Sequence, residues 1–228
     1  MTATFITATG TDIGKTFLAT GMIRYFRDGG VPIDALKPVA TGFDDDAPEW
    51  TDTAALLGAL GRRTTSDEIQ RVSPFRFAAP LSPDMAAARE NRKLDFNALL
   101  EFTRRAVQNH QGHLLIEGIG GIMVPLDDQH TVLDWMMAIN RPVVLVTGSY
   151  LGSISHTLTC LDVLAKRSLQ VKALVVNETQ GSTVPITDTM DTMRRFARDV
   201  PVFPMPRLAP GITEHPTFGK ICDTLLKA

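Results

Sequence analysis

Short apolar runs alternate along the chain with longer stretches in which apolar residues recur every three or four positions. The runs predict strands at residues 4–7, 33–36, 114–117, 143–146, 172–176 and 202–203. The central four are rich in Val, Ile and Leu, as is typical of parallel strands that are buried on both faces.

The stretches between these runs have the spacing of amphipathic helices. They predict helices near residues 15–28, 95–109, 131–139, 154–167 and 187–198. Asp95 and Ser153 stand at the start of two of these helices and are the predicted N-caps, because their side-chain oxygens can accept hydrogen bonds from free backbone N–H groups. The regular alternation predicts an α/β fold with a doubly wound, mainly parallel sheet, helices on both faces and right-handed crossovers.

Residues 42–94 interrupt this alternation. They are rich in Pro, Gly and Asp, and only a short helix at 52–60 is predicted within them. We expect the remainder to form loops that lie over the active face of the sheet. The chain shows no repeat and no linker, so residues 1–228 are predicted to form a single domain, as the length also favours.

Composition narrows the possible classes of function. Hydrophobic residues make up 44% of the 228 positions and charged residues 21%, which is typical of a globular enzyme. A net charge of −2 without a basic stripe argues against a nucleic-acid partner. The two cysteines, Cys160 and Cys222, form no disulfide framework, so a cytoplasmic location is expected. No apolar run is long enough to predict a membrane span.

Residues 7–16 carry the clearest chemical signal. They follow a predicted strand and open the first predicted helix with Gly14, Lys15 and Thr16, which is the context of a phosphate-binding loop. Lys15 is expected to reach the β- and γ-phosphates of a nucleotide, and Thr16 to ligate Mg²⁺. The predicted fold is therefore of the P-loop NTPase type, with ATP and Mg²⁺ as cofactors. Thr9 stands where the usual pattern has its first glycine, which indicates a variant class of this loop.

Polar residues follow other predicted strands as well, and the carboxyl ends of parallel strands meet at one edge of a sheet. Lys37 is expected to be a second cation near the γ-phosphate or near a carboxylated substrate. Glu117 precedes a glycine-rich segment, and its carboxylate suits a Mg²⁺ ligand or a water-holding group. Asp52 is either a functional carboxylate or the cap of a helix, and residues 44–46, all Asp, are expected to form a solvated loop.

Six segments, taken in their order along the chain, form a more specific pattern. They are residues 9–16, residues 37–42, Asp52, residues 117–121, residues 151–154 and residues 176–177. Together they resemble the dethiobiotin synthetase family over residues 3–208. The resemblance implies an ATP-dependent cyclo-ligase of biotin biosynthesis that uses Mg²⁺ and acts as a homodimer. Such an enzyme joins CO₂ to 7,8-diaminononanoate through a carbamate and a carbamic–phosphoric anhydride and closes the ring of dethiobiotin.

The resemblance also implies roles for individual residues. Those nearest the reaction are Lys15 and Lys37 for catalysis, Thr16, Asp52 and Glu117 for Mg²⁺, and Thr11, Lys37 and Thr41 for the diamine. Those implied to bind the nucleotide are Asp12, Ile13, Gly14, Lys15, Thr16, Phe17, Asp52, Glu117, Gly118, Ile119, Gly120, Asn177, Glu178, Pro206, Arg207 and Leu208. Within this set, Asn177 would contact the adenine edge and residues 206–208 would line the base.

Three positions depart from the family pattern. Thr41 stands where Ser is common and keeps the hydroxyl, and Glu178 stands where Asp is common. Ser155 stands where the family often has Asn, a residue that helps to hold the substrate carboxylate across the dimer. The resemblance therefore leaves the recognition of the carboxylate open.

Three other classes of protein share parts of the pattern. A regulatory or partitioning ATPase of the deviant P-loop type would carry an extra lysine early in the loop, where this chain has Ala8 and Thr9. An amidotransferase or acyltransferase module would require a further domain, for which the chain is too short. A nucleotide-binding protein without catalysis would have little use for Lys37 and Glu117.

Overall fold

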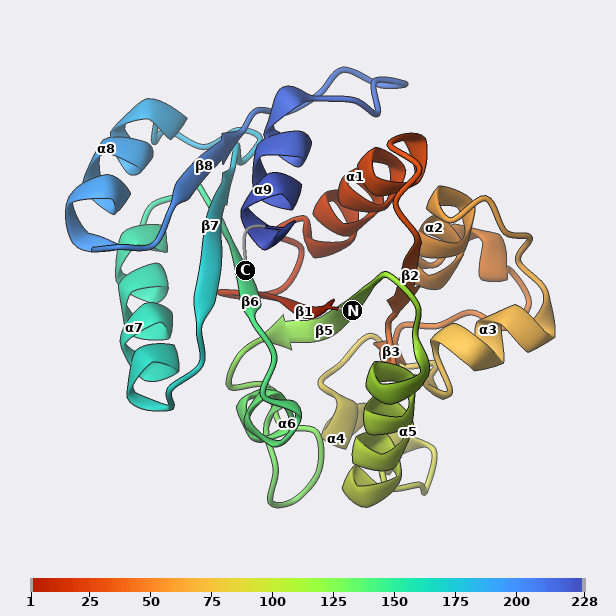
Figure 1. Ribbon diagram of the computed structural model, residues 1–228. Coiled ribbons are helices and arrows are strands. Elements are labelled where there is room, and N and C mark those ends of the chain that lie inside the picture. The colour runs from red at the N-terminus through yellow and green to blue at the C-terminus, as the bar shows by residue number, and fades with distance from the viewer. Residues whose placement is uncertain (1, 227–228) are drawn as a thin grey trace.

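The computed structural model describes residues 2–226 and contains a six-stranded parallel sheet in the order β2-β5-β1-β6-β7-β8 (Figure 1). The strands are β1 (Thr2–Ala8), β2 (Ile33–Leu36), β5 (His113–Gly121), β6 (Val143–Gly148), β7 (Val171–Asn177) and β8 (Val202–Met205). All six lie at predicted positions, and most extend further than predicted. The prediction of a mainly parallel α/β sheet is confirmed.

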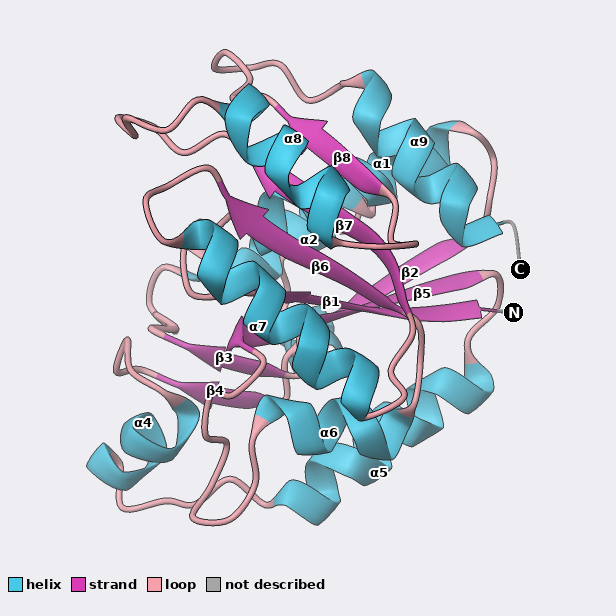
Figure 2. Cartoon of the chain, turned by 90° about the vertical axis from the view of Figure 1, so that its left-hand side faces the viewer, coloured by secondary structure: helices cyan, strands magenta, loops and turns pink. Residues whose placement is uncertain are grey.

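Helices cover both faces of this sheet because alternate side chains of each strand point in opposite directions. In β6, Val143 and Leu145 pack with one set of helices, whereas Val144 and Val146 pack with another set. The first set is α5 (Phe96–Asn109), α6 (Val132–Ile139), α7 (Ser153–Lys166) and α8 (Ile186–Phe196). The second set is α1 (Lys15–Asp28), α2 (Asp52–Ala59), α3 (Ser66–Val72) and α9 (Pro216–Leu226). Figure 2 shows α5 to α8 in front of the sheet and α1, α2 and α9 behind it.

The order of the strands places β1 between β5 and β6. The chain passes from β1 to the edge strand β2, returns through β5, and then builds β6, β7 and β8 on the other side. The winding direction therefore reverses beside β1, and in such sheets ligands bind at the carboxyl ends of the strands around this reversal. The predicted phosphate loop leaves β1 at that point.

The interrupted region, residues 42–94, is more regular than predicted. It contains η1 (Pro48–Trp50), α2, α3 and α4 (Pro83–Arg89). In addition, β3 (Val39–Thr41) pairs in parallel with β4 (Phe75–Phe77) in a separate two-stranded sheet. The prediction of mostly irregular loops was wrong because strands of three residues and helices of seven are too short to produce a periodic pattern. The C-terminal helix α9 was also missed.

The two predicted N-caps differ in their outcome. The Asp95 side chain accepts a hydrogen bond from the backbone N–H of Ala98 at 3.0 Å, so this prediction is confirmed. Ser153 instead begins α7, and the cap is Gly152 with φ of 95°, a conformation that favours glycine. The prediction for Ser153 was wrong because the turn before α7 uses this left-handed glycine in place of a side-chain cap. No helix in residues 2–226 is long and apolar enough to span a membrane.

Candidate active site

The phosphate loop lies between β1 and α1, and its backbone conformation depends on Gly14. This residue has φ of 89°, and a Cβ added to it would lie 2.4 Å from Nδ2 of Asn177. Both the backbone angle and the close neighbour therefore require glycine. Lys15 begins α1 directly after it, and its Nζ donates to the carbonyl oxygen of Gly10 at 3.2 Å. The lysine therefore reaches back across the loop that the helix closes.

Asn177, at the end of β7, holds this loop in place. Its Nδ2 donates a hydrogen bond of 2.6 Å to the carbonyl oxygen of Ile13. Its Oδ1 is buried and has no hydrogen-bond partner within residues 2–226. A buried acceptor without a partner is unfavourable, and this oxygen is therefore free to accept a hydrogen bond.

The second lysine, Lys37, follows β2 and is buried between two carboxylates. Its Nζ lies 2.6 Å from Oε1 of Glu117 and 2.7 Å from Oδ2 of Asp52. Glu117 comes from the neighbouring strand β5, in which Ile116 pairs with Leu36 directly before Lys37. The pairing of the two strands therefore places the lysine beside the glutamate, although 80 positions separate them in sequence.

Thr16 links this ion-paired group to the phosphate loop. Its Oγ1 donates to Oε1 of Glu117 at 2.7 Å. The other carboxylate oxygen of Glu117, Oε2, is buried without a hydrogen-bond partner in the described part of the chain. Among residues 2–226, no group of three His, Cys, Asp or Glu side chains has the arrangement of a metal site. One hydroxyl and two carboxylates still suit Mg²⁺, which is bound by few protein oxygens and completed by water and phosphate.

Burial and the proximity of these charges shift the pKa of Lys37, Asp52 and Lys15. Burial alone would lower the pKa of Lys37, but the carboxylates of Glu117 and Asp52 outweigh it and raise that pKa. Burial would likewise raise the pKa of Asp52, but the charge of Lys37 and its hydrogen bond to this carboxylate outweigh it and lower that pKa. Burial, and then repulsion by Lys37, lower the pKa of Lys15 to about 8. Lys37 is thus held charged by protein carboxylates, whereas Lys15 lacks a comparable partner and is open to an anionic ligand.

Two cavities lie on either side of the phosphate loop. The first, of about 600 Å³, is lined by Lys15, Lys37, Thr41 and Asp52 and closed by residues 80–83. The second, of about 560 Å³, is lined by Asn177 and Arg207, together with residues that follow β6 and β7. Thr11 and Asp12 line both, so the two cavities are neighbours at the loop. A nucleotide placed across the loop could extend its phosphates into the first cavity and its base into the second.

Most of the predicted site residues meet at these cavities, but a few do not. Phe17 packs against Phe218 with ring centroids 5.7 Å apart and lines neither cavity. Gly118, Pro206 and Leu208 also lie outside both linings, as does the buried Glu117, which contacts the lining residues Thr16 and Lys37. Asp52 is the first residue of α2, and Thr51 is its cap, so the reading of Asp52 as a cap was wrong.

One wall of the first cavity was not predicted. Residues 80–83 and Val124 line the cavity together with Lys37. The two prolines in the sequence Pro80-Leu81-Ser82-Pro83 are the signal that could have indicated a rigid segment there. The triple-Asp loop at 44–46 is exposed, as predicted.

Comparisons with known proteins agree with this geometry. The model of a family described as an AAA domain matches residues 2–208. A protein of Acidiphilium cryptum called ATP-dependent dethiobiotin synthetase BioD is 46% identical over 202 residues, covering 87% of this chain and 91% of that protein. A protein of the same name from Caulobacter sp. is 39% identical over 229 residues, covering 100% of this chain and 96% of that protein.

Solved structures with a similar fold are more distant in sequence. The septum site-determining protein MinD of Pyrococcus horikoshii, complexed with Mg-ADP, has a TM-score of 0.56 at 15% identity and covers 99% of this chain and 96% of that one. The cell division ATPase MinD of Pyrococcus furiosus has a TM-score of 0.55 at 16% identity and covers 100% and 99%. These similarities establish the P-loop NTPase fold. Because the relatives with high identity are named as synthetases, the partitioning-ATPase alternative is not favoured.

Proposed function

This chain belongs to the ATP-dependent dethiobiotin synthetase family, and we propose that it forms dethiobiotin from 7,8-diaminononanoate, CO₂ and ATP in biotin biosynthesis. The observation that carries the proposal is the cavity of about 600 Å³ in which Lys15, Lys37 and Thr41 face one space. A phosphate loop alone would suit any ATPase. A second buried lysine, Lys37, and the hydroxyl group of Thr41 in the same cavity suit a reaction between ATP and a further substrate.

The first step that these residues support is phosphoryl transfer to a carbamate. One amine of the diamine adds to CO₂ and releases a proton to water, which gives a carbamate. An oxygen of the carbamate then bonds to the γ-phosphorus while the bond from that phosphorus to ADP breaks. Such a transfer requires chiefly positioning and neutralisation of charge. We assign Lys15 to the β- and γ-phosphates, because it begins α1 at the phosphate loop. We assign Lys37 to the charge that the carbamate and γ-phosphate share, because it lines the same cavity from the end of another strand, β2.

The second step closes the ring. The free amine bonds to the carbamoyl carbon, the bond from that carbon to the phosphate oxygen breaks, and the amine loses a proton as phosphate leaves. Both amines belong to one molecule, so a site that fixes them gains a large effective concentration. We assign the positioning of the diamine to Thr11 and Thr41, which line the same cavity as Lys37. No dyad of general bases is required by this step.

Mg²⁺ is part of the proposal, with Thr16, Asp52 and Glu117 as the residues that would hold it. The support is the unpaired Oε2 of buried Glu117 and the oxygen donors around it. When bound, the ion would neutralise charge on the β- and γ-phosphates. Asp52 and Glu117 have a second role besides holding the ion, because both carboxylates also contact Lys37 and keep it charged.

Recognition of the base is assigned to the second cavity. Nδ2 of Asn177 is engaged by the Ile13 carbonyl, so its free Oδ1 offers only an acceptor, which suits the amino group of adenine. Oε2 of Glu178 accepts a hydrogen bond of 2.9 Å from the backbone N–H of Arg207. This contact supports a role for residues 206–208 beside the base, with Glu178 as the group that holds them.

The function is tested by measuring phosphate release from ATP with and without the diamine and bicarbonate. We expect release to depend on both, with one phosphate for each dethiobiotin detected by mass spectrometry. The reason is that the acceptor of the phosphoryl group is the carbamate, which forms only when both are present. Equal turnover without the diamine, or turnover without product, would show an ATPase of another kind.

We propose that the chain forms a homodimer through residues 150–156. Leu151 is 88% exposed, although it is a large apolar residue, and it lies beside Gly152 at the start of α7. Tyr150 and His156 are joined by a hydrogen bond of 3.0 Å between the hydroxyl and Nδ1, which makes this turn a fixed surface. An exposed apolar residue on an ordered turn beside the site suits contact with a second chain.

The test of the dimer is light scattering on the protein and on Leu151→Asp at micromolar concentration. We expect the mass of two chains for the parent and a shift toward one chain for the variant, because the added charge would have to be desolvated. Leu226→Asp is the matched control, since Leu226 is an exposed apolar residue of α9. A fully active parent with the mass of a single chain would contradict the proposal.

Two predictions from the sequence remain part of this proposal. One is that residues 1–228 act as a single P-loop domain, which is supported by the packing of α9 against α1 at the opposite end of the chain. The other is a cytoplasmic location. It is supported by Cys160 and Cys222, which are buried and free, as is usual where thiols stay reduced.

A further inference from the structure

The turn at residues 72–76 contacts the backbone of the second lysine, Lys37, and of Pro38 that follows it. The carbonyl oxygen of Val72 accepts a hydrogen bond of 3.1 Å from the backbone N–H of Lys37. The backbone N–H of Phe75 donates to the carbonyl oxygen of Pro38 at 3.0 Å. The backbone on both sides of the Lys37–Pro38 bond is therefore attached to this one turn.

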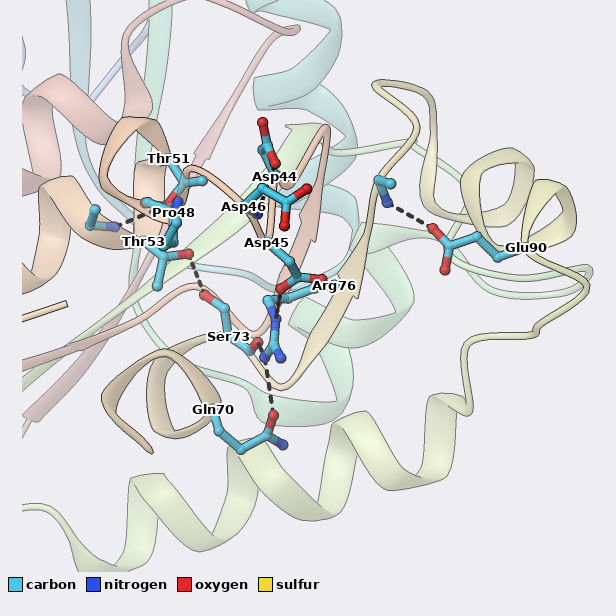
Figure 3. Close-up of polar contacts among 12 residues, drawn as sticks. Asp44, Asp45, Asp46, Pro48, Thr51, Thr53, Gln70, Ser73, Arg76 and Glu90 are labelled. Carbon is cyan, nitrogen blue, oxygen red and sulfur yellow. Dashed lines mark hydrogen bonds and ion pairs between the residues drawn. The ribbon is translucent and has the colours of Figure 1, made fainter. Parts of the chain in front are cut away.

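The same turn reaches the start of α2 through a pair of hydroxyl groups. Oγ1 of Thr53 and Oγ of Ser73 lie 2.8 Å apart, and neither residue has exposed surface (Figure 3). Thr53 directly follows Asp52, whose carboxylate contacts Lys37 at 2.7 Å. Because both hydroxyls are buried, the loss of either one leaves the other without this partner. The pair therefore fixes the carboxylate of Asp52 relative to the lysine from outside the cavity.

Arg76 connects the turn to the wall that carries Thr41. Its Nη1 donates to the carbonyl oxygen of Ser73 at 2.6 Å and to Oε1 of Gln70 at 3.0 Å (Figure 3). Its guanidinium group lies 5.3 Å from the centre of the Phe43 ring. Arg76 is paired with Ala40 in the small sheet, immediately before Thr41. A planar guanidinium can lie against the ring while its Nη1 makes both hydrogen bonds, a geometry that the tetrahedral ammonium of a lysine does not reproduce.

We propose that Thr53, Ser73 and Arg76 are positioning residues, which hold Lys37, Asp52 and the Thr41 strand as one unit during phosphoryl transfer. None of the three lines the first cavity, so they act through the residues that do. The inference rests on the proposed function, because it takes Lys37, Asp52 and Thr41 to be the groups that face the substrates. Phosphoryl transfer is sensitive to such placement, since an error of about 1 Å can cost about 10²-fold in rate.

The test compares Thr53→Val and Ser73→Ala with the parent in dethiobiotin formation. We expect each to lower kcat by about tenfold or more, on the scale of losing a group that orients a ligand-binding residue. The Kd of ATP, measured by calorimetry, should stay within about twofold, because the phosphate loop keeps its own contacts. Thr53→Ser should restore kcat toward the parent value, because it keeps the hydroxyl. The double variant should lose no more than the worse single variant, because either substitution removes the same pair.

Controls separate positioning from general stability. Thr103 is a fully buried threonine on the other face of the sheet that also bonds a side chain, Nε1 of Trp135, at 3.2 Å. Thr103→Val should therefore lower the melting temperature without lowering kcat. If Thr53→Val and Ser73→Ala lower the melting temperature but keep the parental kcat, or if their losses add in the double variant, the inference is wrong.

Arg76→Lys gives an independent test in a residue that is not fully buried. It keeps the charge but loses the planar fork, so we expect the KM of the diamine to rise several-fold while the Kd of ATP stays unchanged. An unchanged KM would remove Arg76 from the proposal. The proposed function is tested separately. If the parent protein itself formed no dethiobiotin, the proposed function would be wrong, whatever the variants showed.

Discussion

Replacing Lys37 with Met is expected to lower kcat by about 10²-fold or more, the scale of removing one preorganised charge stabiliser. The reason is its location, since Lys37 lines the first cavity from the end of β2, whereas Lys15 begins α1 at the phosphate loop. It therefore meets charge that develops only when carbamate and γ-phosphate come together. An interaction of this kind affects kcat more than it affects binding of ATP. Steady-state rates and calorimetric titration of ATP measure the two effects.

Lys15→Met is the matched contrast, because it removes the same charge from the same cavity. Lys15 meets the nucleotide before the diamine arrives, so the Kd of ATP should rise by about 10- to 100-fold, the range of a hydrogen bond to a charged group. The melting temperature of both variants should be measured as well, since Lys37→Met leaves Asp52 and Glu117 without their shared cation. If Lys37→Met loses ATP binding as severely as Lys15→Met, or keeps the parental kcat, this division of roles is wrong.

Glu117→Gln is expected to raise the Mg²⁺ concentration for half-maximal rate by about tenfold or more, since even groups that only orient metal ligands contribute that much. Glutamine keeps the volume of the side chain and an acceptor for Thr16, but it removes the charge and one carboxylate oxygen. Lys37 retains its contact with Asp52, so the melting temperature should fall less than in Lys37→Met. The rate is measured against Mg²⁺ at saturating ATP and diamine.

Asp34→Asn provides the control for Glu117→Gln. Asp34 is also an ion-paired carboxylate, bound to Arg62 at 3.2 Å and Arg71 at 2.9 Å, but it lies outside the first cavity. Its variant should keep the parental dependence on Mg²⁺. A Glu117→Gln protein that melts early and yet keeps that dependence would mean that Glu117 acts only as the structural partner of Lys37.

The sequence by itself determined the main sheet, most of the helices that cover it and the phosphate loop. These features depend on neighbouring residues, because a buried parallel strand needs a run such as residues 143–146 and an amphipathic helix needs a repeated apolar spacing. The loop at Gly14, Lys15 and Thr16 is local for the same reason, since strand, turn and helix follow each other directly.

Only the tertiary structure decided how the second half of the site is assembled. The sequence indicated Lys37, Asp52 and Glu117 one at a time, but their contacts at 2.6–2.7 Å depend on the pairing of β2 with β5 and on the placement of α2. The sequence also missed the small sheet, whose three-residue strands have no pattern of their own and form only when residues 39–41 meet residues 75–77. Contacts between distant segments follow from packing of the whole chain, so no local spacing could have predicted them.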